Sequence, residues 1–169
     1  DVVEQLRGDL GRIGVQFDTW FSERTLHELA KVGQVLETLR SGGLTYEKDG
    51  ATWLSAENLG DQRDRVLVKS DGNTTYLLND LAYHLDKVDR GWEHLIDIWG
   101  ADHHGQVKSV QVGMQALGVG SADVPEPEVI LGQFVTLVRE GETVRLSKRT
   151  GDIVTLSDIL DEVDPDVAR

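Results

Sequence analysis

Three short stretches of this sequence carry side chains that could do chemistry together. The first runs from Tyr76 to Asp80, where a phenol and a carboxylate stand four residues apart and would be neighbours on one helix face. A guanidinium suits such a pair best among cations, because its planar fork forms two hydrogen bonds with a carboxylate. The same spacing also fits the solvent face of an ordinary amphipathic helix, so both interpretations stay open.

The second stretch, Gly100–Gly105, follows an apolar run and contains Asp102, His103 and His104. If the apolar run is a strand, these side chains lie at its carboxyl end, where open α/β sheets bind ligands, and beside a helix start that favours phosphate. The same residue types would suit a metal-dependent phosphoesterase, or a helix start that the histidines merely cap and pack. The further upstream aspartates of such a metal site cannot be placed in this sequence.

The third stretch is a basic loop over residues 144–151. Ser147, Lys148 and Arg149 supply a hydroxyl and two cations in consecutive positions of an otherwise acidic chain. Cations beside a nucleotide can stabilise the charge that develops on a transferring phosphate. A solvated basic turn would have the same composition. The Walker-type phosphate loop, Gly-x4-Gly-Lys-Ser/Thr, does not occur.

Hydrophobic periodicity and turn residues predict the elements that position these stretches. Helices are expected over residues 1–14, 23–39 (broken near Gly33), 76–88, 105–117 and 156–163 (capped by Thr155 or Ser157). Strands are expected over residues 15–17, 44–47, 52–54, 65–69, 94–100, 129–139 and 143–146. Asp49-Gly50 predicts a hairpin. A compact α+β segment over 15–72 followed by alternating helices and strands favours an α/β fold with part of a parallel sheet.

The composition is typical of a soluble globular protein, with 39% hydrophobic and 28% charged residues among 169. No run approaches the ~18 apolar residues that a membrane span needs. The sequence shows no secretory signal and no cysteine, which favours a cytoplasmic protein without a membrane partner. Seventeen basic and 30 acidic residues give a net charge of −13, which argues against this chain being the main RNA-binding surface.

Taken in order, the three stretches resemble the catalytic domain of arginyl-tRNA synthetases, which are class I aminoacyl-tRNA synthetases. Ser147-Lys148-Arg149 is similar to the KMSKS signature of that class, with Arg145 at the position of its first lysine. The run from Tyr76 to Asp80 resembles the helix whose tyrosine and aspartate contact the substrate arginine. Gly100–Gly105 resembles the segment beneath the adenosine.

Phe17–Glu23 and Gly60–Leu67 resemble parts of the inserted region of that domain, so the resemblance covers nearly the whole chain. It implies the second half of a class I synthetase Rossmann-like nucleotide-binding fold over residues 73–169, preceded by a small inserted α+β segment over residues 1–72. The first ATP motif of the family, His-x-Gly-His, does not occur, and both ends look abrupt. The chain is therefore expected to be a fragment that is inactive alone and that self-associates through an exposed strand edge.

The resemblance implies ATP-dependent activation of L-arginine to arginyl-adenylate and its transfer to tRNA(Arg). Tyr76 and Asp80 would bind arginine. The implied ATP-binding residues are Gly100, Asp102, His103, His104 and Lys148. The implied catalytic residues are Ser147, Lys148 and Arg149. Mg²⁺ would accompany ATP as substrate, with no tightly bound cofactor and no metal held by the protein. The alternatives are a metal-dependent phosphoesterase using Asp102, His103 and His104, and a non-catalytic half-domain binding module.

Overall fold

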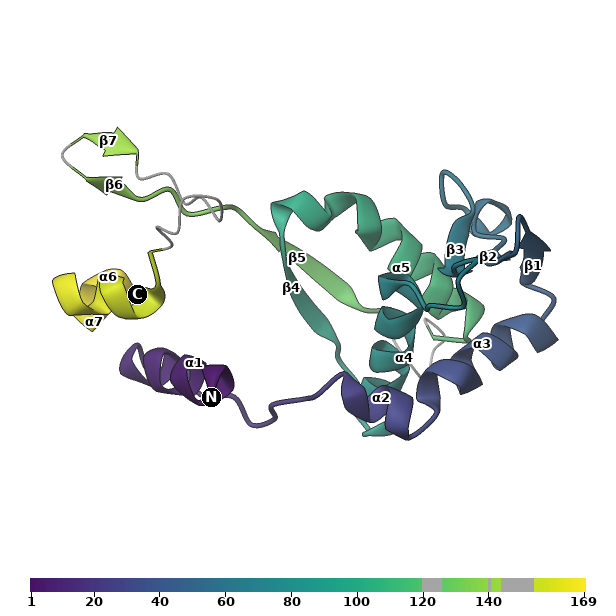
Figure 1. The fold of residues 1–169 in the computed structure, drawn as a ribbon, viewed down its shortest axis with the longest axis horizontal. Helices are drawn as coiled ribbons and strands as arrows, with labels where there is room; N and C mark the ends of the chain where they lie inside the picture. Colours follow the sequence, from purple (N-terminus) through teal and green to yellow (C-terminus); the bar gives the residue numbers. More distant parts are fainter. Residues whose placement is uncertain (120–125, 140, 144–153) are drawn as a thin grey trace. The chain divides into compact units, whose positions relative to one another are not determined.

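The computed structural model describes residues 1–119, 126–139, 141–143 and 154–169 of the chain (Figure 1). Ser147, Lys148, Arg149 and most of the strand expected over 143–146 lie outside the described residues. The chain divides into two compact units: residues 1–20 with 135–169 form the first, and residues 21–134 form the second. Together the described elements make a mixed α/β fold, as predicted.

Among its described residues, the first unit contains helix α1 (Val2–Arg12) together with two strands and two helices of the C-terminal region. They are β6 (Val138–Arg139), β7 (Glu142–Thr143), α6 (Leu156–Glu162) and α7 (Pro165–Ala168). Arg12 of α1 donates to the carbonyl of Leu160 at 2.9 Å and to the carboxylate of Asp161 at 2.7 Å. These contacts join α1 to α6, which is distant from α1 in the sequence but lies next to it in space.

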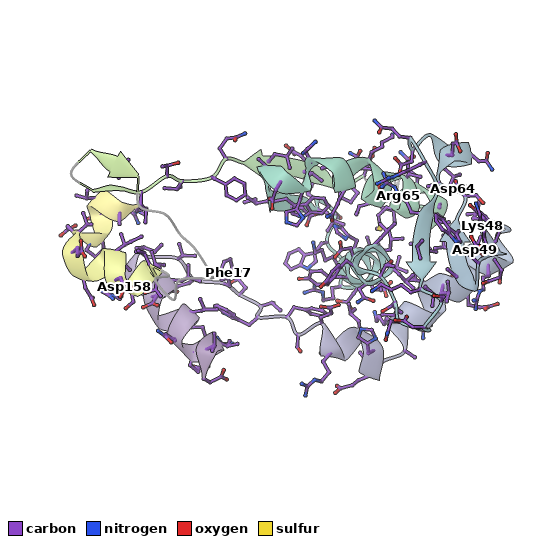
Figure 2. The ribbon with its side chains drawn as sticks, turned by 45° about the horizontal axis from the view of Figure 1, so that its top comes forward. Phe17, Lys48, Asp49, Asp64, Arg65 and Asp158 are labelled. Carbon is purple, nitrogen blue, oxygen red and sulfur yellow. The ribbon has the colours of Figure 1, made fainter. Side chains whose placement is uncertain are left out.

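Helix α6 begins at the predicted cap, and Thr155 rather than Ser157 provides it. The Thr155 hydroxyl accepts from the backbone of Asp158, and the Asp158 carboxylate (labelled in Figure 2) accepts in return from the backbone of Thr155. This reciprocal capping box satisfies two backbone donors at the helix start. The strand predicted over residues 15–17 is wrong: this segment has no regular structure, and Phe17 is exposed and packs edge-on against the Trp20 ring at 5.5 Å.

The second unit contains an antiparallel sheet of three strands in the order β1 (Thr45–Lys48), β2 (Ala51–Leu54) and β3 (Arg65–Val68). Asp49 and Gly50 have φ angles of 53° and 73°, which is the geometry that a two-residue turn between right-twisted strands requires. The predicted hairpin is therefore confirmed, and Figure 2 shows Lys48 and Asp49 together at its tip.

The long helix predicted over residues 23–39 is two helices, α2 (Arg24–Glu28) and α3 (Lys31–Ser41). The chain breaks at Ala30, whose φ of 55° is left-handed, and not at Gly33, which lies inside α3. No local pattern indicates this position, because alanine is ordinarily the best helix former and only tertiary packing can hold it in a left-handed conformation.

Helix α4 (Tyr76–Asp89) and strand β4 (Ile96–Gly100) match their predicted ranges closely. A one-turn helix, η2 (Ala101–His103), then leads into α5 (His104–Ala116). Strand β4 pairs in parallel with β5 (Glu128–Gly132), from Ile96 opposite Glu128 to Gly100 opposite Gly132. The single strand predicted over 129–139 is two strands, β5 and β6 (Val138–Arg139), separated by residues 133–137 without regular structure. β5 ends where its pairing partner β4 ends.

The core of the second unit lies where α3, α4 and α5 meet the small sheet (Figure 1). Its fully buried side chains include Leu39, Leu54, Leu67, Leu78, Leu81, Val110, Val112 and Met114. Helix α4 presents Leu78, Leu81 and Ala82 to this core, as its periodicity predicted. Within the described ranges, no helix combines the length and apolar character that crossing a membrane requires.

Candidate functional site

A pocket of about 600 Å³ lies between α4 and the carboxyl end of β4. It is lined by Tyr76, Asp80, Tyr83, His84, Lys87, Asp97, Ile98, Trp99, Gly100, His103 and Gln106. The pocket thus brings together Tyr76 and Asp80 from one predicted site and Gly100 and His103 from another. Asp102 and His104 are exposed at the same strand end but do not line it.

The start of α4 is fixed by Thr75, which places Tyr76 at the first helical position. The Thr75 hydroxyl donates to the carbonyl of Val66 in β3 at 2.9 Å, and it accepts from the backbone of Leu78. The cap therefore ties the first turn of α4 to the sheet. Tyr76 is 83% exposed, so its ring stands free at the pocket edge one turn before Asp80.

Asp80 has an environment that favours a cationic ligand. Burial raises the pKa of Asp80, and the negative charges of Glu23 and Asp97 raise it further, whereas the positive charges of His84 and Lys87 oppose the rise. An added cation would stabilise the ionised carboxylate. A ligand that needs this charge should therefore bind less tightly as the pH falls through the pKa of Asp80.

A smaller pocket of about 210 Å³ also borders Asp80 and contains a carboxylate that the sequence did not indicate. Glu23 lines it and accepts from the Asn79 side-chain amide at 2.6 Å. Phe21 and Tyr83 stack beside it, with ring centroids 4.5 Å apart. Glu23 joins the site because α2 packs against α4, and no local spacing in the sequence signals that contact.

Asn79 also lines this second pocket, and its amide oxygen is an unsatisfied acceptor. It is buried and has no hydrogen-bond partner among the described residues. Buried acceptors without partners are uncommon and costly in native proteins. Two carboxylates and two aromatic rings surround this small space, and a guanidinium could donate to the carboxylates while stacking on a ring.

The carboxyl end of β4 has a closely packed glycine, as a ligand site would, and two histidines that pack near the helix start. A side chain on Gly100 would come within 2.6 Å of the Asp102 carboxylate, so a larger residue would crowd the approach to this strand end. His103 lies edge-on to Trp99, with ring centroids 6.5 Å apart. The Nδ1 of His104 lies 3.1 Å from the carbonyl oxygen of Ala101, so this imidazole packs against the helix start.

The metal-site alternative finds no support in the described residues. Among residues 1–119, 126–139, 141–143 and 154–169, no three histidine, cysteine, aspartate or glutamate side chains gather closely enough to hold an ion. The Nε2 of His103 lies 3.7 Å from a carboxylate oxygen of Asp102, but no third ligand completes a metal site with them among the described residues.

Comparison with known proteins points to one family. The family model described as tRNA synthetases class I (R), catalytic domain, matches residues 9–167. The arginine–tRNA ligase of Bacillus pumilus (strain SAFR-032) is 50% identical over 167 residues, which make up 99% of this chain and 29% of that protein. The arginine–tRNA ligase of Thioalkalivibrio sulfidiphilus (strain HL-EbGR7) is 45% identical over 168 residues, or 99% of this chain and 28% of that protein.

Solved structures agree with these relatives. A crystal structure from Campylobacter jejuni, assigned as an arginyl-tRNA synthetase, matches with a TM-score of 0.85 and 34% identity, covering 98% of this chain and 35% of that one. The arginyl-tRNA synthetase of Thermus thermophilus shares the fold, with a TM-score of 0.71, 16% identity, and coverage of 92% and 31%. The chain spans about 30% of the length of the curated relatives.

Proposed function

This chain belongs to the family of class I arginyl-tRNA synthetase catalytic domains, and from that premise we propose that it supplies part of an arginine–tRNA ligase active site. The proposed activity is ATP-dependent formation of arginyl-adenylate from L-arginine, followed by transfer to tRNA(Arg). The observation that carries this proposal is the pocket that unites Tyr76 and Asp80 with Gly100 and His103.

The proposed arginine site lies around Asp80. Its carboxylate would accept two hydrogen bonds from the guanidinium, and the exposed Tyr76 would stack or bond at the pocket edge. Glu23 is a second carboxylate within the same charge environment. Lysine would fit this site less well, because a single ammonium cannot match the planar fork and would leave acceptors unpaired.

The proposed ATP site lies at the end of β4. Gly100 would allow the adenosine to approach the backbone, and Asp102, His103 and His104 would surround it at the start of α5. Ser147, Lys148 and Arg149 keep the role that the sequence resemblance implies, with Lys148 neutralising phosphate charge. Mg²⁺ would enter with ATP as part of the substrate.

The proposed chemistry needs positioning and charge stabilisation more than covalent catalysis. The carboxylate of arginine attacks the α-phosphorus of ATP, and pyrophosphate leaves with the electron pair of the broken P–O bond. A ribose hydroxyl of the tRNA terminus then attacks the arginyl carbonyl, and AMP leaves. Each step gains from fixed geometry and from cations beside the phosphate.

The finer fold assignment is also a proposal. The unit β4–α5–β5 has the strand–helix–parallel strand connection of a nucleotide-binding sheet, which supports residues 73–169 as the second half of a Rossmann-like fold. Residues 1–72 would then be the inserted α+β segment. Ile98 and Ile130 are 77% and 46% exposed on the paired strands, which supports the proposed tendency to self-associate.

The direct test is arginine-dependent exchange of pyrophosphate into ATP. The protein expressed from its complete gene should catalyse exchange with L-arginine in the presence of tRNA(Arg), and exchange with lysine should be slower by orders of magnitude. The 169-residue chain alone should be nearly inactive. Exchange that depends equally on another amino acid, or full activity of the isolated chain, would contradict the proposal.

Replacing Glu23 by glutamine tests the second carboxylate of the arginine site. The amide keeps the size and the acceptor for Asn79 but loses the charge, so the KM for arginine should rise by up to about fivefold, since an exposed charge contributes at most about 1 kcal/mol. The KM for ATP should not change. Steady-state exchange with arginine and ATP varied separately measures both KM values. Glu28→Gln is the matched control, because Glu28 is an exposed acid at the other end of α2. Equal behaviour of the two variants would remove Glu23 from the site.

A further inference from the structure

Three polar side chains, two of them buried and one partly buried, form a cluster in the wall of the pocket. His84 and Asp97 are only 3% and 7% exposed, and Lys87 joins them. The Nε2 of His84 lies 2.5 Å from one carboxylate oxygen of Asp97, and Lys87 donates to the other at 2.6 Å. The cluster therefore links α4, which carries Tyr76 and Asp80, to β4, which ends at Gly100.

The second ring nitrogen of His84 also faces an acceptor. Its Nδ1 lies 2.7 Å from the backbone carbonyl oxygen of Asp80, one turn earlier in α4. A carbonyl and a carboxylate can only accept, so both hydrogen bonds form at once only when the imidazole carries a proton on each nitrogen. The geometry thus holds a positive charge within one helical turn of the Asp80 carboxylate.

The partner of this imidazolium is an ionised carboxylate. Burial raises the pKa of Asp97, but the hydrogen bonds from His84 and Lys87 outweigh it and lower the pKa to about 2. The positive charges of His84 and Lys87 balance the negative charges of Asp97 and Asp80, and Glu23 adds a further negative charge near Asp80. Buried ion pairs contribute little to the free energy of folding. The role of this cluster is therefore better explained by the position in which it holds α4 against β4.

We propose that His84 is a positioning residue of the arginine site: it fixes the turn of α4 that carries Asp80 against β4, and its charge keeps the Asp80 carboxylate ionised for the guanidinium. The inference rests on the proposed function, because it concerns the same substrate. His84 is not expected to touch arginine. It acts on Asp80 through the backbone carbonyl of that residue and through its positive charge.

The charge argument includes every group that faces Asp80. Glu23 precedes α2 and Asp97 lies on β4, and both carry negative charges that oppose its ionisation; Lys87 and His84 lie on α4 and favour it. Removing the positive charge of His84 leaves Lys87 alone against two carboxylates. Asp80 should then take up a proton at higher pH, and arginine should be lost earlier on acidification.

The test is His84→Gln in the protein from the complete gene, assayed by arginine-dependent pyrophosphate exchange. Glutamine keeps a donor for Asp97 but removes the charge and the bond to Asp80. We expect the KM for arginine to rise about tenfold near neutral pH, with a smaller change in kcat and in the KM for ATP. The rise of the arginine KM on acidification should begin at higher pH than in the unsubstituted protein. His84→Asn, which also lacks the charge, should behave in the same way.

Lys31→Gln is the matched control, because Lys31 anchors α4 through ion pairs with Asp86 at 3.0 Å and Asp89 at 2.8 Å and does not line the pocket. It should lower stability while leaving the arginine KM and its pH profile unchanged. The proposal is overturned if His84→Gln resembles this control, if it raises the arginine and ATP KM values equally at every pH, or if neither His84 variant folds. If the unsubstituted protein shows no arginine dependence, the proposed function fails first, and the inference fails with it.

Discussion

Replacement of Asp80 by alanine is expected to raise the KM for arginine by about 100-fold or more, because truncating one partner of a buried, hydrogen-bonded charge pair costs about 2–5 kcal/mol. Without substrate, the substitution should lower the free energy of unfolding only slightly, since burial already disfavours the ionised carboxylate of Asp80 and raises its pKa. The effect should therefore appear on substrate binding far more than on folding. The discrimination between arginine and lysine should shrink along with the affinity.

Steady-state pyrophosphate exchange with arginine and ATP varied separately measures this effect, in the protein from the complete gene. Asp89→Asn is the matched control, because Asp89 is an exposed acid at the other end of α4 and pairs with Lys31. Its arginine KM should equal that of the unsubstituted protein. A normal arginine requirement in Asp80→Ala, combined with altered ATP binding, would mean that the arginine pocket is assigned to the wrong place.

The parts of the fold that the sequence predicted well are those that local interactions decide. The periodicity of α4, the Asp49-Gly50 turn and the Thr155 cap each depend on residues within a few positions of one another. The break at Ala30 and the irregular segment over 15–17 depend on packing partners far along the chain, so no local pattern indicates them.

The residues of the candidate site also differ in whether local sequence or long-range packing brings them together. Tyr76 and Asp80 are neighbours on one helix, so their spacing predicted that the two side chains share a face. Only the family resemblance indicated that they form an arginine site. Glu23 reaches them only through the packing of α2 on α4, and His84 reads as one polar residue among the apolar positions of α4 until Asp97 of β4 is seen opposite it. The roles of Ser147, Lys148 and Arg149 stay predictions, because these residues lie outside the described ranges.

The packing of α4 on α5 supplies the prediction with the largest effect on stability. Gly113 of α5 lies against Leu81 of α4, and a Cβ on Gly113 would come within 2.6 Å of a Leu81 methyl carbon. Leu81 is fully buried in the core, so its methyl groups cannot swing away without displacing other side chains. Gly113→Ala is therefore expected to lower the free energy of unfolding by about 1–3 kcal/mol, even though alanine is the better helix former.

The same substitution at Gly33 of α3 should have the opposite sign. A Cβ at that position meets no atom within 4 Å, and the residue lies inside a helix, so Gly33→Ala should raise the free energy of unfolding by about 0.5–1 kcal/mol. Urea unfolding of both variants, followed by circular dichroism, gives the two values under one set of conditions. Because helix propensity favours alanine equally at both positions, a difference in sign isolates the contact between α4 and α5. If Gly113→Ala stabilises the protein as much as Gly33→Ala does, α5 does not pack on Leu81 as closely as the structure shows, and the wall of the pocket behind α4 is looser than its geometry implies.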